Sequence, residues 1–348
     1  MRRVKVIVVG SSRQTRGGIT SVIKAYENSD IWDKFNCVWV ESHIDSGIFN
    51  KLFYFMVGLI KFLFEIGGAD IVHIHHSEPV STIRKIPFIL LTKLFRKKLI
   101  MHFHSFSADT TICGKFRDLY KFVFKKSDFV IVLSEYWKDL LYHEFELCEK
   151  VHVIYNPCLP LKDNIVTREK TILFAGTITS RKGYSVLLKA FSMFNKKIPG
   201  WNLVFAGNGE IEKARREARD YGIIDNTKFL GWVSGTDKEK VFESASIFCL
   251  PSFAEGFPMA VLDAVSFGVP VITTPVGGIL DAFEHKSNAL IFEPGDSDAL
   301  CLCLEELALN NSLRESIKLQ AFKTAKDRFE IQTLNTLMEK LYLRLLMH

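Results

Sequence analysis

The sequence predicts an α/β protein of two similar domains, each built around a parallel β-sheet. Short apolar runs rich in β-branched residues alternate with amphipathic stretches, which is the pattern of strands connected by covering helices. The alternation stops at Asn156–Pro160, where two prolines precede a polar stretch that ends at Arg168. A chain of 348 residues is also too long for one ordinary core.

The alternation places a first set of strands before the proline segment and a second set after it. The candidate strands of the first half are Val4–Val9, Cys37–Val40, Ile71–His75, Leu99–His104, Phe129–Leu133 and Val151–Ile154. Amphipathic segments between them include Gly18–Tyr26 and Lys115–Lys125. The strands of the second half are Thr171–Ala175, Leu203–Ala206, Lys228–Leu230, Ile247–Leu250, Val271–Thr273 and Leu290–Phe292. Its helices are Tyr184–Asn195, Glu210–Tyr221, Asp237–Glu243, Pro258–Phe267 and Asp298–Ala308.

These elements set the expected domain boundaries. We expect a first domain over residues 1–160 and a second over residues 161–330. The tail from Ser312 to His348 is expected to be helical nearly throughout, and residues 331–348 are expected to pack back on the first domain.

Composition excludes several classes of protein. Hydrophobic residues make up 48% of the chain, which excludes disorder, and no run of about 18 uncharged apolar residues predicts a transmembrane helix. The start, Met1–Gly10, is basic and then apolar, but the run is short for a signal peptide and fits a first buried strand. The seven cysteines are scattered without zinc spacing, which is typical of reduced cytosolic thiols.

Charge is distributed unevenly along the chain. Met1–Asp128 contains 20 basic and 11 acidic side chains, whereas the remainder contains 25 and 28. A basic first half predicts an anionic partner there: a phosphate-bearing acceptor, an anionic membrane or nucleic acid. Nucleic acid is disfavoured, because no nucleic-acid-binding motif accompanies the charge.

Glycine-rich loops follow three of the expected strands. Gly17 and Gly18 open a helix after the first strand, where the backbone can approach a ligand closely and the helix N-terminus attracts phosphate oxygens. A plain tight turn is the alternative. Gly207-Asn208-Gly209 begins like a dinucleotide fingerprint but lacks its third glycine, which disfavours NAD.

The loop from Gly176 to Gly183 also carries charge. Arg181 and Lys182 stand at the expected start of a helix. A diphosphate needs this combination of backbone donors and cations, which offset the charge that develops on a leaving group. A solvated basic turn is the alternative interpretation.

Histidines lie at the ends of the third and fourth strands. His73 and His102 alternate with strand residues and fit satisfied core positions, whereas His75 and His104 are expected to lie further toward the ligand. A zinc site would need a matched carboxylate or cysteine set, so no metal site is predicted.

Two carboxylates follow the tenth expected strand. Pro258 suits the first turn of a helix, so Glu255 comes just before that helix and Asp263 lies about two turns along it, near the same face. Two carboxylates so placed can each hold a pair of sugar hydroxyls. Helix capping alone could explain Glu255, but it does not explain why so many unusual loops gather at the same edge. Gly277 and Gly278 form a further loop over that edge.

Together these motifs resemble glycosyltransferase family 4, a large retaining group with the GT-B fold. That fold consists of two Rossmann-like domains whose parallel sheets face each other across a cleft. The resemblance covers almost the whole chain and is most specific from Gly176 to Gly278. The family's signature is Glu, seven residues, Glu, and Glu255 and Asp263 stand at its two ends. The resemblance implies that Glu255 holds hydroxyls of the donor sugar and that Asp263 holds the nucleotide ribose.

The resemblance also assigns the other site residues. It implies that Lys182 contacts the donor diphosphate and that His104 lies near the reacting side of the donor sugar, so the expected catalytic groups are His104, Lys182 and Glu255. It places four glycines around the donor phosphates and sugar: Gly17, Gly18, Gly277 and Gly278. The expected nucleotide-sugar site is completed by Gly176, Arg181, Gly207, Gly209, Gly256, Phe257 and Pro258.

Two departures from the family pattern concern the donor site. Asp263 is one carbon shorter than the usual glutamate, so its reach or the position of the nucleotide must shift slightly. The family usually has an arginine directly after Gly176, where this chain has Thr177. We hypothesise that Arg181 supplies the missing cation.

The implied reaction is transfer of a sugar from a nucleotide diphosphate with retention, UDP being favoured over GDP. Basic side chains and helix N-termini would stabilise the departing phosphate, so neither a metal ion nor a cofactor is expected. Glu255 is interpreted as a positioning group, and domain closure would exclude water. The alternatives are a nucleotide-sugar epimerase of the same fold and a non-catalytic nucleotide-sugar-binding subunit.

The acceptor side is indicated by an aromatic, apolar segment from Lys51 to Phe64 that is flanked by lysines. A buried helix that covers the sheet is the favoured interpretation, and an interfacial helix on an anionic bilayer is the alternative. The second would suit an enzyme that elongates a glycan or lipid-linked oligosaccharide for bacterial surface polysaccharide. We expect a cytoplasmic protein, with peripheral contact at the inner face of the cell membrane in that second case.

Overall fold

The computed structural model describes residues 3–147, 149–162 and 168–347 of the chain. The chain forms two compact units, of which unit 1 comprises Met1–Pro157 with Ile331–His348 and unit 2 comprises Cys158–Glu330. Residues 163–167, which belong to the polar stretch predicted as a linker, lie outside the described residues, as do residues 1–2, residue 148, and residue 348 of the predicted tail helix.

Unit 1 is a parallel six-stranded sheet with the strand order β2-β1-β3-β4-β5-β6. Its strands are β1 (Val6–Gly10), β2 (Val38–Glu41), β3 (Ile71–His76), β4 (Lys98–Phe103), β5 (Phe129–Val132) and β6 (Val151–Val153). Its helices are α1 (Gly18–Glu27), α2 (Asp30–Lys34), α3 (Ile48–Ile66), α4 (Pro79–Leu94), α5 (Arg117–Lys126), α6 (Glu135–Phe145) and α13 (Ile331–Met347).

Unit 2 repeats the architecture with the order β12-β11-β10-β7-β8-β9, and its strands are again parallel. The strands are β7 (Thr171–Ala175), β8 (Asn202–Ala206), β9 (Thr227–Gly231), β10 (Ile247–Leu250), β11 (Val271–Thr273) and β12 (Leu290–Ile291). The α-helices are α7 (Tyr184–Lys197), α8 (Ile211–Asp220), α9 (Gly235–Ser244), α10 (Met259–Ser266), α11 (Ser297–Leu309) and α12 (Asn311–Arg328). Short 3-10 turns are η1 (Ser180–Lys182), η2 (Ile224–Asn226) and η3 (Ile279–Asp281). The predicted fold class of two Rossmann-like domains with parallel sheets is confirmed.

Each sheet has a switch point, where successive strands are placed on opposite sides of a central strand. In unit 1, β1 is followed by β2 on one side and by β3 on the other, and in unit 2 the chain returns from β9 to place β10 beside β7. Ligands of open parallel sheets bind beyond the carboxyl ends of the strands at such switch points. The loops after β1 and β3, and after β7 and β10, are therefore the places where ligand sites are expected.

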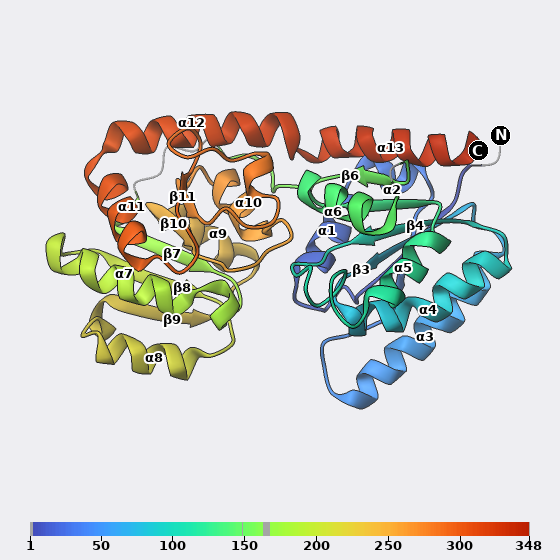
Figure 1. Cartoon of the computed structure of the whole chain (residues 1–348), viewed down its shortest axis with the longest axis horizontal. Coiled ribbons are helices and arrows are strands. Elements are labelled where there is room, and N and C mark those ends of the chain that lie inside the picture. The colour runs from blue at the N-terminus through green and yellow to red at the C-terminus, as the bar shows by residue number, and fades with distance from the viewer. Residues whose placement is uncertain (1–2, 148, 163–167, 348) are drawn as a thin grey trace. The chain divides into compact units, whose positions relative to one another are not determined.

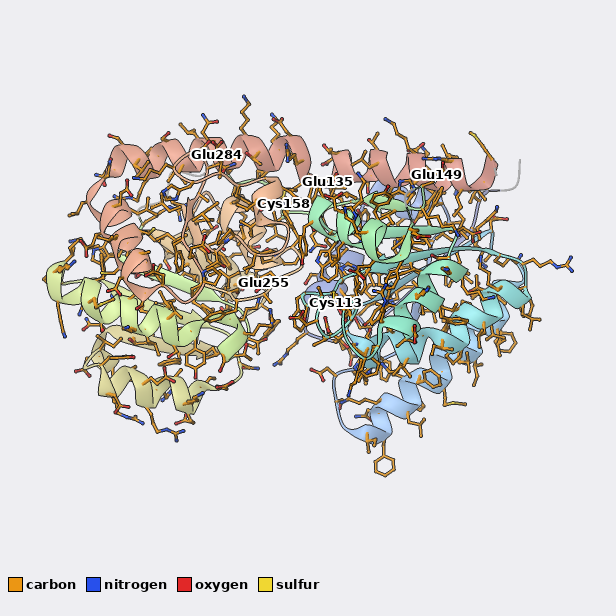
Figure 2. All side chains as sticks on the ribbon, in the orientation of Figure 1. Cys113, Glu135, Glu149, Cys158, Glu255 and Glu284 are labelled. Carbon is orange, nitrogen blue, oxygen red and sulfur yellow. The ribbon has the colours of Figure 1, made fainter. Side chains whose placement is uncertain are left out.

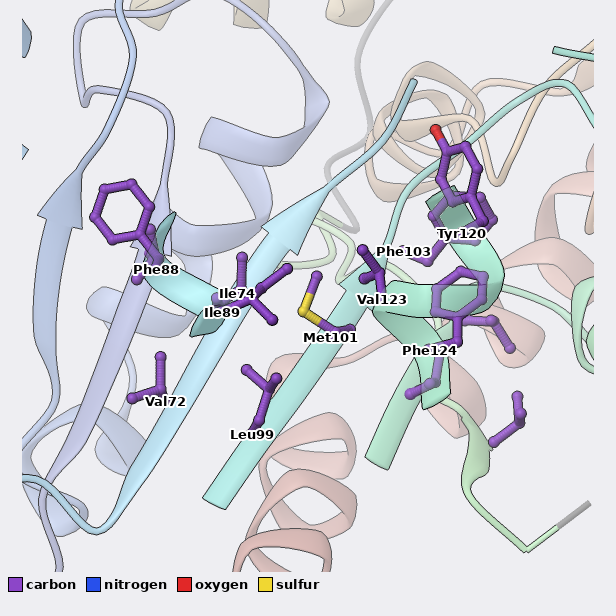
Figure 3. Packing of buried hydrophobic residues seen from close by; sticks show 14 of the residues in the cluster. Val72, Ile74, Phe88, Ile89, Leu99, Met101, Phe103, Tyr120, Val123 and Phe124 are labelled. Carbon is purple, nitrogen blue, oxygen red and sulfur yellow. The ribbon is translucent and has the colours of Figure 1, made fainter. Parts of the chain in front are cut away.

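The core of unit 1 packs helix α4 against the central strands of its sheet. Val72 and Ile74 of β3 lie beside Leu99 and Met101 of β4, and Phe88 of α4 belongs to the same buried cluster (Figure 3). These strands are buried along their length because helices cover both faces of a parallel sheet. This burial holds the strand ends, and the loops that follow them, in fixed positions.

Helix α3 meets the rest of unit 1 with one face only. Gly58, Phe62 and Ile66 are buried, and the Phe62 ring lies 5.1 Å from the Phe88 ring of α4. The outer face is apolar and exposed, with Phe49 86% and Phe64 85% accessible. The expectation that this segment is a buried helix is wrong for that face, because α3 lies at the outside of the unit (Figure 1). Among the described residues, no helix combines the length and the apolar character needed to cross a membrane.

We expect Gly58→Ala to destabilise unit 1. A Cβ at this position would stand 2.3 Å from the carbonyl oxygen of Glu41, so α3 would have to move away from the end of β2. Overpacking costs about 1–3 kcal/mol, which outweighs the roughly 1 kcal/mol that alanine gains over glycine inside a helix. Thermal unfolding followed by circular dichroism should show a lower Tm.

Gly67→Ala is the matched control at the end of the same helix. The φ of Gly67 is −56°, and among the described residues no atom outside its chain neighbours lies within 4 Å of the added Cβ. Its Tm should be unchanged or slightly raised. Equal Tm values for the two variants would contradict the close contact between α3 and β2.

Candidate functional site

The switch point of unit 2 is formed by the loops after β7 and β10. Gly183 brings them together: a Cβ there would lie 1.9 Å from the carbonyl oxygen of Pro251, and its φ of 70° favours glycine. The backbone N–H of Phe253 also donates to the carbonyl of Arg181 at 2.8 Å. The two loops are thus packed backbone to backbone, which fixes the side chains that they carry.

Lys182 and Glu255 meet across these loops. The Nζ of Lys182 lies 2.5 Å from Oε1 of Glu255, which also accepts a hydrogen bond from Ser252 Oγ at 2.7 Å. Arg181 NH1 stands 3.4 Å from the same oxygen and donates to the carbonyl of Ala254 at 2.5 Å. Glu255 is 7% exposed and lies among the loops of unit 2 (Figure 2). The basic loop and the carboxylate singled out from the sequence therefore come together.

The arrangement of these groups suits a multiply charged anion. Two cations share one carboxylate, so the cluster keeps an excess positive charge in a largely buried place, where electrostatic attraction is stronger than in water. Helix capping does not explain Glu255: the N-cap of α10 is Pro258, and no side chain caps that helix. The carboxylate is instead held by Ser252 and by the two cations.

Asp263 has a partner that the sequence reasoning missed. It lies on α10, is 6% exposed, and its Oδ2 is 2.6 Å from Nζ of Lys238 on α9. Burial raises the pKa of Asp263, and the nearby ammonium offsets part of that rise. Lys238 lies 25 positions before its partner on a different helix, so no local spacing could have revealed it.

The glycine pair after β11 packs directly on the Glu255 loop. Gly277 has a φ of 61°, and a Cβ there would lie 2.2 Å from the Glu255 carbonyl and 2.5 Å from that of Gly256. The Gly278 N–H donates to the Gly256 carbonyl at 2.8 Å. Gly277, which was predicted to lie near the donor, is therefore needed in the first place for the approach of two loops.

The predicted glycines after β7 and β8 have a similar role. A Cβ on Gly207 would lie 1.8 Å from the Gly176 carbonyl, and one on Gly209 would lie 2.3 Å from the Ile178 carbonyl. The side chain of Asn208 accepts a hydrogen bond from the backbone N–H of Trp232 at 3.0 Å. Trp232 is 40% exposed at this edge. The sequence reasoning did not single out Trp232, although exposed aromatic rings are suited to stacking on bases.

Phe257 and Pro258 contribute to the site through packing. Phe257 is 4% exposed, and its ring lies 5.2 Å from that of Phe329, the residue that ends α12. Phe283 lies 6.4 Å from Phe329 on the same buried surface. The side chain of Phe257 therefore points into the core of unit 2 and supports the Glu255 loop from beneath.

In unit 1, Gly17 and Gly18 stand where α1 begins. Gly18 is the first residue of the helix, as predicted, and Gly17 precedes it with a φ of 156°. No side chain caps this end of α1, and among the described residues no atom beyond the chain neighbours lies within 4 Å of a Cβ on Gly17. The start of α1 is thus open to a ligand, in contrast to the crowded glycines of unit 2.

Four histidines form a stack at the ends of β3 and β4. The ring centroids of His73 and His75 lie 4.6 Å apart, and those of His102 and His104 lie 4.2 Å apart. His75 Nδ1 is 2.9 Å from His104 Nε2, and His73 is hydrogen-bonded to Tyr342 of α13 at 2.8 Å. The expectation that His75 reaches toward the ligand is wrong, because it is 2% exposed inside the stack. His104 is only partly covered.

Burial keeps these rings neutral. Desolvation lowers the pKa of His73 and of His104 to about 3. A base with so low a pKa accepts a proton poorly at neutral pH, since general bases work best near the operating pH. In this arrangement His104 can orient a hydroxyl by hydrogen bonding, but it is unsuited to remove a proton.

His73, His75 and His102 also bring ring nitrogens within 4.8 Å of one another, as a metal site would require. A metal bond lies in the plane of the imidazole ring, whereas these rings are stacked, with interplanar angles of 16° for His73 on both His75 and His102. His73 Nε2 already bonds His102 Nδ1 at 3.2 Å, so these two nitrogens are engaged with each other. The rings would have to turn before they could share an ion.

Unit 1 also contains a buried cation that the sequence reasoning missed. Lys85 of α4 is 3% exposed and donates to the Ser42 hydroxyl, and desolvation with nearby Arg84 lowers its pKa to about 7. Arg84 contacts the His43 ring at 2.9 Å, which places both cations near the carboxyl end of β2. Lys85 stands three residues before the buried Phe88, on the same face of α4. This spacing was the signal in the sequence that could have indicated its burial.

Two family models match the chain. Residues 6–158 match the model described as Glycosyltransferase Family 4, and residues 160–324 match the model described as Glycosyl transferases group 1. The two matched ranges together cover most of the chain.

The curated relatives named here match from 53% to 69% of the chain. An uncharacterized glycosyltransferase of Haemophilus influenzae is 34% identical over 188 residues, which are 53% of this chain and 52% of that protein. The amylovoran biosynthesis glycosyltransferase AmsK of Erwinia amylovora is 25% identical and aligns over 69% of this chain and 62% of its own length. The capsular polysaccharide biosynthesis glycosyltransferase CapM of Staphylococcus aureus is 28% identical over 57% of this chain and 49% of its own. This chain spans about half the length of several relatives that it matches.

Among solved structures, HepE of Anabaena in complex with UDP-glucose superimposes with a TM-score of 0.80 at 16% identity. The match covers 98% of this chain and 100% of the HepE chain. A glycosyltransferase from Rickettsia africae superimposes with a TM-score of 0.74 at 18% identity, covering 99% of both chains. At these identities the likeness concerns the fold.

We expect the stability of the protein to fall as the pH is lowered from about 6.5 toward 3. An unfolded histidine has a pKa of about 6.5, whereas burial holds His73 and His104 at about 3. Below pH 6.5 the unfolded chain therefore binds protons that the folded stack does not, and at pH 5 each of these groups removes about 2 kcal/mol. Tm should be measured between pH 7.5 and 5, and His73→Gln should show a shallower decrease.

His143→Gln is the control for this pH dependence, because its ring is exposed on α6. This variant should keep the slope of the wild-type protein. A slope in His73→Gln as steep as that of His143→Gln would exclude the stack as its source.

We expect Lys238→Met to destabilise unit 2, because it leaves the Asp263 carboxylate buried without its partner. Breaking a largely buried ion pair from one side costs about 3 kcal/mol, and replacing both members costs much less. Urea unfolding should show a large loss for Lys238→Met and partial recovery for Lys238→Met with Asp263→Asn. Lys240→Met, exposed on the same helix, should be neutral. If the two methionine variants unfold alike, the pair does not stabilise the unit.

Proposed function

This chain belongs to glycosyltransferase family 4, and we propose that it transfers a sugar from a nucleotide-diphosphate sugar to an acceptor hydroxyl. The observation that carries the proposal is the meeting of Lys182, Arg181 and Glu255 at the switch point of unit 2. A sugar diphosphate brings both kinds of group that such a cluster can hold, because its phosphates need cations and its hydroxyls need a carboxylate. We assign unit 2 to the donor and unit 1 to the acceptor.

In the proposed reaction the diphosphate leaves while the acceptor hydroxyl attacks from the same face, so the anomeric configuration is retained. Lys182 and Arg181 stabilise the charge on the departing phosphate, and the Arg181 guanidinium replaces the cation that Thr177 lacks. When the donor binds, hydroxyls of its sugar replace part of the contact between Glu255 and the Lys182 ammonium. These cations do the work that a metal ion does in other transferases, so the proposed reaction requires none.

Asp263 is proposed to hold the ribose of the donor, and the nearby Lys238 ammonium favours the charged form of its carboxylate. The glycines at positions 17, 18, 176, 207, 209, 256, 277 and 278 are proposed to bring backbone close to the phosphates and the sugar. His104, neutral at physiological pH, is proposed to orient a hydroxyl on the reacting side.

UDP is the proposed carrier, ahead of GDP. HepE, which shares the fold, was crystallised with UDP-glucose, and this supports a test of uridine donors first. The proposed acceptor is a glycan or lipid-linked oligosaccharide of bacterial surface polysaccharide. Support comes from two relatives, one named for amylovoran and the other for capsular polysaccharide biosynthesis, and from the basic first half of the chain. Such an enzyme would work in the cytoplasm, at the inner face of the cell membrane.

The donor and the reaction class can be tested together. Thermal-shift measurements with UDP, GDP and ADP sugars should identify one base, because a ligand that binds the folded state raises Tm. A radiolabelled donor is then incubated with the protein and a membrane extract. Label in lipid or glycan supports transfer, interconversion of the free donor indicates an epimerase, and binding without either product indicates a non-catalytic subunit.

We expect Lys182→Ala to reduce turnover about 100- to 1,000-fold, since it removes a group that stabilises the leaving phosphate. Arg181→Ala should reduce turnover by a smaller factor and weaken donor binding in the thermal-shift measurement. Initial rates at saturating donor separate the two effects.

Lys189→Ala is the matched control for these variants, because its side chain is exposed about two turns along α7 from Lys182. It should retain full activity. Unchanged donor affinity and turnover in Arg181→Ala, alongside loss of turnover in Lys182→Ala, would remove Arg181 from the proposed site.

A further inference from the structure

The outer face of α3 is a continuous apolar surface. Nine of its side chains are apolar and more than two fifths exposed: Ile48, Phe49, Leu52, Phe53, Met56, Val57, Ile60, Leu63 and Phe64. They recur three or four residues apart, so they form one stripe along the helix. Scattered exposed leucines are normal in proteins, but a stripe of this length on one helix marks an interaction surface.

The charged residues of α3 do not interrupt this stripe. Lys61 donates to the carbonyl of Trp39 at 2.9 Å, and Glu65 pairs with Lys5 at 2.5 Å, so both side chains turn toward the body of unit 1. Lys51, near the start of the helix, is exposed. The stripe is therefore an apolar surface with an exposed cation close to its first end.

Cations also lie at the other end of the stripe. Lys97 Nζ donates to the carbonyl of Gly67, the residue that ends α3, at 3.1 Å. This bond places the basic run Arg96-Lys97-Lys98 beside the end of the helix. From Ile48 to Lys98 the sequence contains eight basic and three acidic side chains. Of those three, Glu65 pairs with Lys5, and Glu78 accepts hydrogen bonds from Ser105 and Thr110.

We infer that this α3 face docks unit 1 on an anionic lipid bilayer. An apolar stripe flanked by lysine and arginine lies in the headgroup region of such a membrane, with its aromatic side chains in the acyl boundary and its cations on the anionic headgroups. The helix rests on the bilayer rather than crossing it, since one face is packed on unit 1. The inference deepens the proposed function, because a lipid-linked acceptor is presented at such a surface.

A second copy of the chain is a poorer occupant of this face. In a two-fold symmetric dimer the same surface would meet itself, so the cations at the ends of both stripes would face other cations. Anionic headgroups complement those charges instead. The excess of basic over acidic side chains in this region is what favours a membrane over self-association.

Co-sedimentation with vesicles tests the inference on the full chain. The wild-type protein should pellet with vesicles in which a third of the phosphatidylcholine is replaced by phosphatidylglycerol, and much less with phosphatidylcholine alone. Phe49→Gln with Phe64→Gln should lower the partition coefficient about tenfold or more. Lys51→Gln with Arg96→Gln should lower it only for the anionic vesicles, and added salt should reduce wild-type binding in the same way.

The controls place matched changes in unit 2. Leu309→Gln with Leu319→Gln removes two exposed apolar side chains, 72% and 63% accessible, and Lys323→Gln with Lys326→Gln removes two exposed cations. Both should bind vesicles like the wild-type protein. Because the four replaced α3-side residues are exposed, each variant should also keep the wild-type Tm.

The inference is overturned if the wild-type protein does not bind anionic vesicles, or if the phenylalanine variant binds them as well as the leucine control. It is also overturned if the wild-type protein is a dimer without vesicle binding and the phenylalanine variant is a monomer, since a second copy would then cover the face. No donor sugar is present in the assay, so its failure leaves the proposed transfer reaction untouched. Conversely, loss of transfer with intact vesicle binding would reject only the reaction.

Discussion

The ion pair between Lys182 and Glu255 is the interaction on which the candidate site depends. A carboxylate that is 7% exposed is stable as an anion only when cations and hydrogen bonds replace water. Here those partners come from the loop after β7 and from Ser252, within reach because Gly183 lets the two loops touch. The sheet supplies the rest, since β7 and β10 are neighbours whose carboxyl ends share one edge. Removal of the Glu255 charge would leave the Lys182 ammonium without its carboxylate partner, whereas removal of the Lys182 charge would leave Glu255 with only Arg181 and Ser252.

Sequence reasoning succeeded where the physics is local or follows from topology. β7, β10 and β11 begin and end at the predicted residues, because each is buried on both faces and bounded by turn residues. The grouping of Lys182 with Glu255 followed from the rule that loops at the carboxyl edge of a parallel sheet meet. Lys238 could not be found in this way, since its pairing with Asp263 depends on how α9 packs beside α10. The exposed outer face of α3 was only the alternative interpretation of its segment for a related reason: hydrophobicity indicates burial but does not say what covers the side chain.

The ionisable groups are arranged differently in the two units. Unit 2 concentrates opposite charges in a small volume, which suits a ligand that is itself charged. Unit 1 keeps the four histidines of the stack uncharged inside, where rings stack and share hydrogen bonds, and its part of the chain carries an excess of basic over acidic side chains. In the proposed reaction, this division would let His104 contribute a directional hydrogen bond without adding charge next to the sugar.

The packing of Phe257 on Phe329 affects the candidate site as well as the core of unit 2. Phe257 is two residues from Glu255, whereas Phe329 is among the last residues of unit 2, and Phe329 also accepts a hydrogen bond from the Cys158 N–H at 2.9 Å. The support beneath the Glu255 loop is thus completed by residues near the end of unit 2. A chain cut short just before Phe329 would still contain the carboxylates, cations and glycines of the site. It would nevertheless lack the ring that supports them, so an intact set of motifs in a shortened homologue is no guarantee of a working donor site.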